Sequence, residues 1–191
     1  QKKYGMALIE SDIINIHGSL VDDEEIYERQ QLVIATESMP KPDWIKTRAI
    51  CWMTALLHFD KLLQIPFILL HKVGRLSYRE IIERFTGDNV KNFSTLLEIY
   101  DFFIETAERI QNGGPEYCRS EKWLNIWWPA DELTLIRLST ENKLDEFYHE
   151  AEELLKLFLK EKLTNFPEPI LCEAISLNRQ LLKQPFQTED K

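Results

Sequence analysis

Residues that favour β-strands are confined to the first fifth of this 191-residue chain, and this distribution constrains its fold more than any other feature. Two runs rich in β-branched residues occur, at 6–16 and 31–36, with an acidic loop between them. After Pro42 the apolar residues recur at helical spacing. Two strands alone do not make a stable sheet. We therefore expect a mainly α-helical, bundle-like domain with two short strand segments near the N-terminus, which pack on the helices or pair with strands outside this chain.

The first predicted helix, residues 44–63, is apolar on nearly all of its faces. Trp52 and Leu56 belong to a stripe with the helical period, while Ile50 and Leu57 fill the other side. A helix of this kind is buried, so we expect it in the centre of the domain. Pro66 then ends or kinks it, because proline lacks the N–H group that continues a helix.

Capping and proline signals divide the rest of the chain. A capping box at residues 77–80 opens a short helix, and amphipathic helices are expected over 94–111 and 143–163. The acidic side chains of the 143–163 helix, Glu150 among them, are expected on its solvent face. These signals predict a strand-containing lead-in at residues 1–40, a helical domain at 41–186 and a frayed tail at 187–191.

Composition excludes several classes of partner. The formal net charge of −9 argues against binding to a phosphate backbone, so no nucleic acid partner is expected. No apolar run reaches the ~20 residues of a membrane span, and no apolar segment typical of a secretory signal follows the N-terminal lysines. We therefore expect a cytoplasmic protein without a membrane partner.

The chain shows no complete catalytic or metal-binding motif. Its three cysteines, Cys51, Cys118 and Cys172, are too far apart for a zinc knuckle, a redox motif or an iron–sulfur loop. A phosphate-binding loop, an HExxH helix and a nucleophile elbow are absent from the sequence as well. We expect reduced thiols, no catalytic residue and no metal ligands in this chain.

A few polar residues remain as candidates for a site. His17 follows a strand within His17-Gly18-Ser19, where barrel and open-sheet enzymes place site residues, although a role in the turn itself explains it better. Glu37 lies beside the second strand run and could act as an acid or a base. His58, on the central helix, is explained as a buried histidine bonded to Thr54 or to a carbonyl group.

Several segments carry a resemblance to a known family: 34–39 with Asp43-Trp44, 52–59 with Leu62-Leu63-Gln64, 78–85, Trp127-Trp128-Pro129, and 147–150. Their order and residue types resemble the C-terminal region of radical S-adenosylmethionine enzymes of the cobalamin-binding type, which are Fe–S oxidoreductases. The resemblance extends over nearly the whole chain. His58 and Gln64 match polar positions of the family motif. Together with His17 and Glu37, they are the substrate-facing candidates.

The resemblance implies that the cofactors are bound by segments that precede this region in the parent enzyme. In such enzymes a cobalamin-binding domain precedes a partial (β/α) barrel, whose CxxxCxxC loop holds a [4Fe–4S] cluster, and a helical extension follows. This sequence lacks CxxxCxxC and the glycine-rich segment that contacts S-adenosylmethionine. The resemblance therefore implies a fragment in which residues 1–40 form the end of the barrel. The cluster, S-adenosylmethionine and cobalamin would belong to the parent enzyme and not to this fragment.

These observations leave three functions open. The first is a helical C-terminal part that covers the barrel and shapes the substrate pocket, with the upstream barrel domain of the same polypeptide as its partner and a small-molecule substrate of unknown identity. The second is a free-standing helical protein-interaction module, favoured by the many large aromatic residues and the all-round apolar helix. The third, a hydrolytic or metal enzyme complete within the chain, lacks a recognisable motif.

Overall fold

The computed structural model describes residues 2–17, 28–162 and 166–182. The fold is mainly α-helical, as expected, with 61% of the described residues in helices and two short antiparallel strand pairs among them. The expected tail at 187–191, the last residues of the expected helical domain and the acidic loop lie outside the described residues. In chain order the elements are η1 (Lys2–Tyr4), β1 (Ala7–Asp12), β2 (Arg29–Ala35), α1 (Lys41–Thr54), η2 (Ala55–Phe59), α2 (Gln64–Lys72), α3 (Tyr78–Glu83), η3 (Gly87–Val90), α4 (Ser94–Gln111), β3 (Cys118–Ser120), β4 (Ile126–Trp128), α5 (Ala130–Thr140), α6 (Leu144–Lys162) and α7 (Glu168–Leu181).

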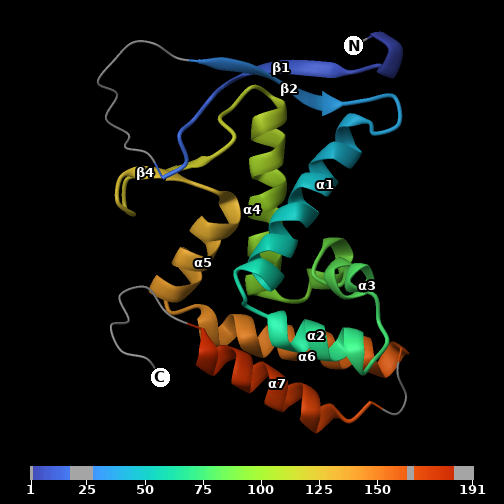
Figure 1. The fold of residues 1–191 in the computed structure, drawn as a ribbon. Coiled ribbons are helices and arrows are strands. Elements are labelled where there is room, and N and C mark those ends of the chain that lie inside the picture. Colours follow the sequence, from blue (N-terminus) through green and yellow to red (C-terminus); the bar gives the residue numbers. More distant parts are fainter. Residues whose placement is uncertain (1, 18–27, 163–165, 183–191) are drawn as a thin grey trace.

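The helices form two groups beneath the N-terminal strand pair. Helices α1 and α4 lie side by side and run from the strands toward the opposite end of the molecule, with α5 beside them (Figure 1). Helices α2, α6 and α7 lie across that opposite end (Figure 1), where α2 packs on α7 and α6 contacts both α4 and α7. One continuous hydrophobic core joins the two groups.

The N-terminal strands pair with each other as an antiparallel ribbon. The register runs from Leu8 opposite Val33 to Asp12 opposite Arg29, and Ile34 at the end of β2 is buried in the core. Consecutive strands of a (β/α) barrel are parallel instead. If residues 1–40 form the end of a barrel, as predicted, an outer edge of this ribbon would therefore have to pair with a strand of that barrel.

A second, smaller strand pair was not expected from the sequence. Strands β3 and β4 are three residues each and pair antiparallel, from Cys118 opposite Trp128 to Ser120 opposite Ile126. Strands this short give no recognisable alternation of apolar and polar residues. Their pairing places the tryptophan-rich segment directly before α5.

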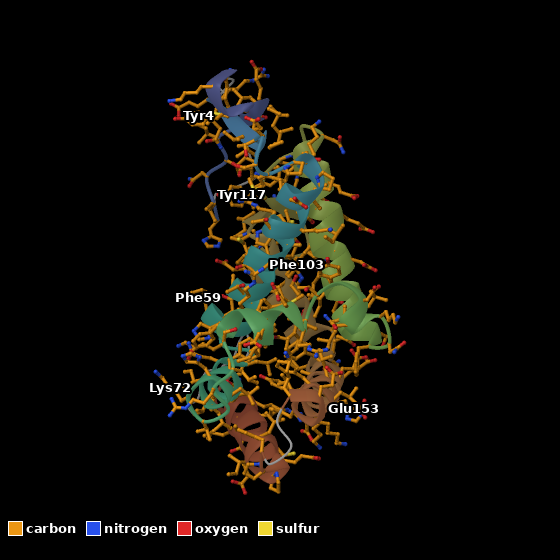
Figure 2. The ribbon with its side chains drawn as sticks, turned by 90° about the vertical axis from the view of Figure 1, so that its right-hand side faces the viewer. Tyr4, Phe59, Lys72, Phe103, Tyr117 and Glu153 are labelled. Carbon is orange, nitrogen blue, oxygen red and sulfur yellow. The ribbon has the colours of Figure 1, made fainter. Side chains whose placement is uncertain are left out.

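The central helix is broken where a continuous helix was predicted over 44–63. Regular α-helix ends at Thr54, a π-helical turn follows as η2, and α2 begins at Gln64 in a new direction. The leucines on both sides of the break, Leu56, Leu57, Leu62 and Leu63, are fully buried. In Figure 2, Phe103 of α4 lies in the interior, whereas Phe59 at the end of η2 projects to the surface and is 69% exposed. The predicted central position is correct, and the break redirects the chain within the core.

Among the described residues, no single helix is long and apolar enough to cross a membrane. The helical stretch Lys41–Phe59 and α2 reach that length and composition only as a pair, and they are bent by 93° where they meet.

Glu150 on α6 caps the N-terminus of α4, which corrects its expected place on the solvent face. Its carboxylate accepts hydrogen bonds from the N–H groups of Thr95, at 3.0 and 3.2 Å, and of Leu96, at 3.0 Å, and from the hydroxyl of Ser94, at 2.9 Å. Glu150 is only 8% exposed. The residue before α4, Phe93, has no side chain that could serve as a cap. An acid from another helix therefore satisfies the open N–H groups and complements the positive end of the helix dipole.

Replacing Glu150 should destabilise the fold more than replacing a surface acid of the same helix. Glu150→Ala leaves the buried N–H groups of Thr95 and Leu96 without acceptors, which we expect to cost about 2–3 kcal/mol of unfolding free energy. The measurement is urea unfolding followed by circular dichroism. Glu153→Ala is the matched control, because Glu153 is on α6 and exposed, and it should change stability by less than about 0.5 kcal/mol. Equal losses in both variants would show that the cap contributes nothing.

Candidate functional site

The break of the central helix leaves a distinctive backbone. The N–H of Asp60 donates to the carbonyl of Ala55 at 2.8 Å, which is the wider π-helical spacing, and the N–H of Leu63 donates to Leu57 at 2.7 Å. Lys61 between them adopts a left-handed conformation with φ of 68°, which is uncommon for a residue other than glycine. Single π-helical turns of this kind are frequent at functional sites.

One buried amide from α7 satisfies the backbone groups that the break sets free. Asn178 donates from Nδ2 to the carbonyl oxygens of Lys61 and Leu62 at 2.8 and 2.7 Å, and its Oδ1 accepts from the N–H of Ile65 at 2.9 Å. The side chain is 3% exposed. Unpaired backbone groups are costly when buried. Asn178 therefore holds the break and the start of α2 in place.

The charges in the first turn of α5 act on the carboxyl group of Asp60. Its Oδ2 is shut off from solvent and has no hydrogen-bond partner within the described residues. Burial, together with the negative charges of Asp131 and Glu132, raises the pKa of Asp60 to about 7. Burial also raises the pKa of Asp131. The charges of three carboxyl groups, those of Asp60, Asp131 and Glu132, thus act on one another around the junction of η2 and α5.

His17 links the N-terminal lead-in to the acidic first turn of α5. Its Nε2 lies 2.7 Å from Oε2 of Glu132, and its backbone N–H donates to the carbonyl of Trp127 at 2.9 Å. The imidazole also meets the ring of Trp128 edge-on, with 5.1 Å between the ring centroids. The turn role and the site role of His17 are therefore compatible, because this turn residue lies against the carboxylate of Glu132.

His58 and Gln64 lie together at the break, but His58 lacks the partner expected for it. The hydroxyl of Thr54 donates to the carbonyl of Ile50 at 2.7 Å, and His58 Nδ1 is buried without a hydrogen bond in the described part of the chain. The expected bond to Thr54 or to a carbonyl is thus wrong for this nitrogen. Gln64 Nε2 donates to the carbonyl of His58 at 3.1 Å. The His58 ring packs edge-on against Tyr78 at 5.3 Å.

Glu37 lies apart from the other three candidates. It is exposed in the turn that joins β2 to α1, where its N–H donates to the carbonyl of Tyr4 at 3.1 Å. This turn is at the opposite end of α1 from the break (Figure 1). The structure therefore brings His58 and Gln64 together, places His17 at the neighbouring junction, and leaves Glu37 at the strand ribbon.

A cavity of about 490 Å³ opens beside the break. This volume falls within the ~300–1,000 Å³ range of small-molecule sites. Its walls come from the break and the start of α2, from α5 and from the end of α7: Asp60, Lys61, Gln64, Ile65, Leu135, Asn178, Leu181 and Leu182. It combines convergent polar groups with an apolar wall, which is the usual composition of a ligand site.

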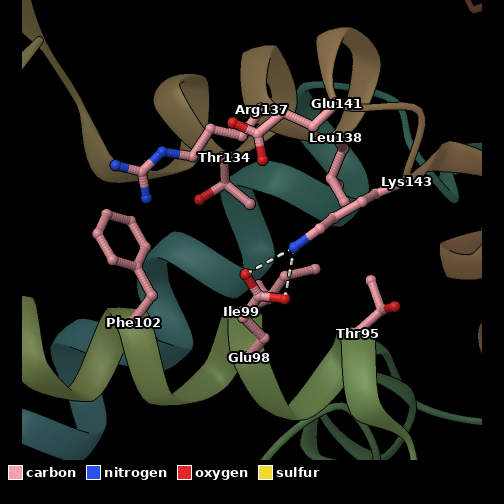
Figure 3. Close-up of a pocket in the computed structure, with 9 residues that line it drawn as sticks. All are labelled: Thr95, Glu98, Ile99, Phe102, Thr134, Arg137, Leu138, Glu141 and Lys143. Carbon is pink, nitrogen blue, oxygen red and sulfur yellow. Dashed lines mark hydrogen bonds and ion pairs between the residues drawn. The ribbon is translucent and has the colours of Figure 1, made fainter.

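A second pocket lies between α4 and α5 and is much smaller. Figure 3 shows Lys143 between the carboxylate oxygens of Glu98, with Nζ–O distances of 2.7 and 2.8 Å, and Arg137 above Phe102. Its volume is about 40 Å³, far below that of organic ligands. The ion pair of Glu98 and Lys143 fills the polar part of this pocket.

The described residues do not fit an iron–sulfur cluster or another metal centre. Within them, no group of three or more His, Cys, Asp and Glu side chains is placed to hold a metal ion. Cys51 is exposed on α1, Cys118 is buried on β3 and Cys172 lies on α7. No step of chemistry through a cluster is therefore assigned to the residues that the structure describes.

Sequence reasoning missed Asp60, Asp131 and Asn178. Asp60 had a local signal, because it is an acid between two apolar runs. Asn178 had a weaker one, a single amide within the apolar face of the last helix. Neither signal indicates which groups interact with the side chain, because those groups lie on other segments of the chain.

Comparison with known proteins adds no assignment. No protein-family model matches this chain, and a search of curated proteins finds no match either. The family resemblance therefore remains a hypothesis.

The raised pKa of Asp60 predicts that stability falls as pH rises from about 4 to about 7. In this window the folded protein retains the Asp60 proton that the unfolded chain releases, so rising pH favours unfolding. Asp60→Asn removes this dependence. Relative to the unsubstituted protein, the free energy of unfolding of this variant should increase from about pH 4 to about pH 7. The measurement is urea unfolding at several pH values. Asp101→Asn, an exposed acid on α4, is the control, and an identical pH profile for both variants would refute the assignment.

Replacing Asn178 should destabilise the break directly. Asn178→Leu leaves the carbonyls of Lys61 and Leu62 and the N–H of Ile65 without their partner, so we expect a loss of about 3 kcal/mol or more. Hydrogen exchange should show faster exchange at the start of α2, and chemical unfolding gives the free energy. Gln180→Leu, at an exposed position on α7, should change stability by less than about 0.5 kcal/mol. A loss below that value for Asn178→Leu would contradict the role of this amide.

Proposed function

We propose that this chain is the helical C-terminal part of a radical S-adenosylmethionine enzyme of the cobalamin-binding type. In this proposal it covers the open side of an upstream barrel, excludes water and shapes the substrate pocket. The iron–sulfur cluster, S-adenosylmethionine and cobalamin would be bound by other domains of the same polypeptide. The substrate is a small molecule whose identity the proposal leaves open.

One observation carries the proposal: segments that resemble the family from distant parts of the sequence meet at the break. Tyr78, from segment 78–85, lies between His58 and His71, with ring centroid distances of 5.3 and 4.4 Å. The hydroxyl of Tyr148, from segment 147–150, lies 3.5 Å from Nδ2 of Asn178, which binds the break. Their contiguity supports a common structural unit.

The polar candidates have different places in this proposal. His58 and Gln64 at the break, with His17 beside it, would face the substrate side. Glu37 lies with the strand ribbon and would face the upstream domain. The exposed ring of Phe59, at the end of η2, would be covered by that domain.

Two experiments test the proposal. Reading the coding sequence upstream should reveal a CxxxCxxC motif in the same frame; a frame without three clustered cysteines would refute the proposal. We also expect the enzyme truncated before residue 41 to retain the optical spectrum of its cluster after anaerobic reconstitution and to lose product formation. Wild-type turnover by the truncated enzyme would show that the helical part does not shape the pocket.

The alternative, a free-standing interaction module, makes the opposite prediction. Exposed apolar side chains such as Phe59, Val73 and Leu124 would then meet a separate protein. A reading frame without the cysteine motif, together with a stable complex lost on Phe59→Ser, would favour it.

A further inference from the structure

We propose that helix α7 pairs antiparallel with α7 of a second copy of this chain, about a two-fold axis, so that the protein forms a weak homodimer. This inference rests on the outer face of α7 and does not depend on the proposed function. Helix α7 lies at the end of the molecule opposite the strand ribbon (Figure 1). The dimer face is therefore remote from the ribbon that an upstream domain would meet.

Helix α7 carries two apolar stripes that run side by side. One, formed by Leu171 and Ile175, is buried where α7 packs on α2 and α6. The other is exposed, with exposed fractions of 43% for Ile170, 49% for Leu177 and 64% for Leu181. A surface helix needs only one apolar face for its own domain. The exposed stripe is therefore available to another chain.

The exposed stripe has the spacing of a coiled-coil seam. Ile170, Ala174, Leu177 and Leu181, which we call the seam, are four, three and four residues apart. This alternation keeps apolar side chains in one line, along which a second helix can interlock. A helix with the same spacing is the natural partner, and every copy of this chain carries one.

An antiparallel second copy fits the seam layer by layer. Ile170 then lies opposite Leu181 of the second copy, and Ala174 lies opposite Leu177 of the second copy. A small residue thus faces a large one in both central layers. A parallel pair would place Ala174 opposite Ala174 of the second copy and leave a gap, which close-packed interfaces avoid. The side-chain sizes therefore favour the antiparallel pair.

The charges of α7 are compatible with self-association. Two of its three charged residues, Glu168 and Arg179, form ion pairs with α6. The third, Glu173, is exposed beside the seam. In the antiparallel pair the nearest flanking side chain of the second copy is Gln180, whose amide can donate to the Glu173 carboxylate. Among the residues of α7, like charges therefore do not oppose each other across the seam.

The seam also reaches the cavity beside the break. Leu181 belongs both to the seam and to the cavity wall. In the dimer, Ile170 of the second copy packs on Leu181 and lies at the edge of the cavity. The second copy thus contributes a residue to that edge.

The size of the face sets the strength of the dimer. Stable complexes bury about 1,200 Å² or more, whereas the face of this 14-residue helix is only about 21 Å long and about 10 Å wide. The net charge of −9 adds repulsion between the copies. We therefore expect micromolar dissociation, with a dimer that becomes stronger as salt screens the repulsion.

The test uses the 191-residue chain and sedimentation equilibrium at protein concentrations up to about 1 mM. Leu177→Glu places a charge in the seam and should weaken dimerisation about tenfold or more. The matched control is Leu157→Glu, at an exposed leucine of α6 outside the seam, which changes the net charge equally and should dimerise as the unsubstituted chain does. Circular dichroism should show that both variants are folded.

Disulfide cross-linking tests the orientation. In a background of Cys51→Ser and Cys172→Ser, the single variants Ile170→Cys and Leu181→Cys are mixed and oxidised. The antiparallel pair brings position 170 opposite position 181 of the second copy, so the mixed disulfide should exceed both symmetric disulfides.

A substitution beside the seam tests the charge arrangement. Gln180→Lys places an ammonium group near Glu173 of the second copy and should tighten the dimer about threefold to tenfold. Asp101→Asn, at an exposed position of α4, is the control, because it changes the net charge by the same amount away from the seam. Equal affinities of these two variants would contradict the antiparallel pairing.

Three other results would overturn the proposal: a monomer at every concentration, equal dimerisation of Leu177→Glu and Leu157→Glu, or an excess of symmetric disulfides. A strict monomer would leave the seam to a partner of another sequence. None of these results depends on whether a cysteine motif lies upstream, so the failure of either proposal can be recognised separately.

Discussion

The structure depends on one requirement: the backbone groups released where the central helix breaks must find partners inside the core. The leucines on both sides of the break are buried, so water cannot supply those partners. Asn178 supplies them, and in doing so it ties α7 to the start of α2. The direction of α2, the position of α7 and the cavity between them all follow from this attachment.

The same break accounts for the electrostatics of the site. A continuous helix would carry Asp60 onward along its axis, whereas the π-helical turn ends at Phe59 and leaves Asp60 where the charges in the first turn of α5 act on it. Acids in that first turn complement the dipole of α5, and they simultaneously disfavour the charge on Asp60. The acids that stabilise the N-terminus of α5 thus also raise the pKa of Asp60, which lines a cavity. Perturbed carboxyl groups in such places are found at functional sites.

Much of the fold was predictable because it depends on local signals. Apolar periodicity located the central, fourth and sixth helices, and the capping box formed by Ser77 and Glu80 is present as expected. The break itself was misplaced, since Pro66 lies within α2 and the chain turns before it. Long-range partners explain the other differences. Glu150 resembles its solvated neighbours in sequence, and only the position of α4 reveals it as a cap. Of the candidate site residues, His58 and Gln64 lie together at the break, whereas Glu37 is separated from them by the length of α1.

The Glu150 cap has a consequence for how the chain selects a single packing. Apolar side chains on α6 could slide or rotate against α4 with little change in buried area, because such contacts are not directional. The carboxylate can reach the N–H groups of Thr95 and Leu96 in only one rotation and one translation of α6. Any other alignment would bury a charge without its donors, at a high energetic cost. Glu150 thus fixes the rotation and the translation of α6 relative to α4. We expect it to narrow the native ensemble to one arrangement of these two helices.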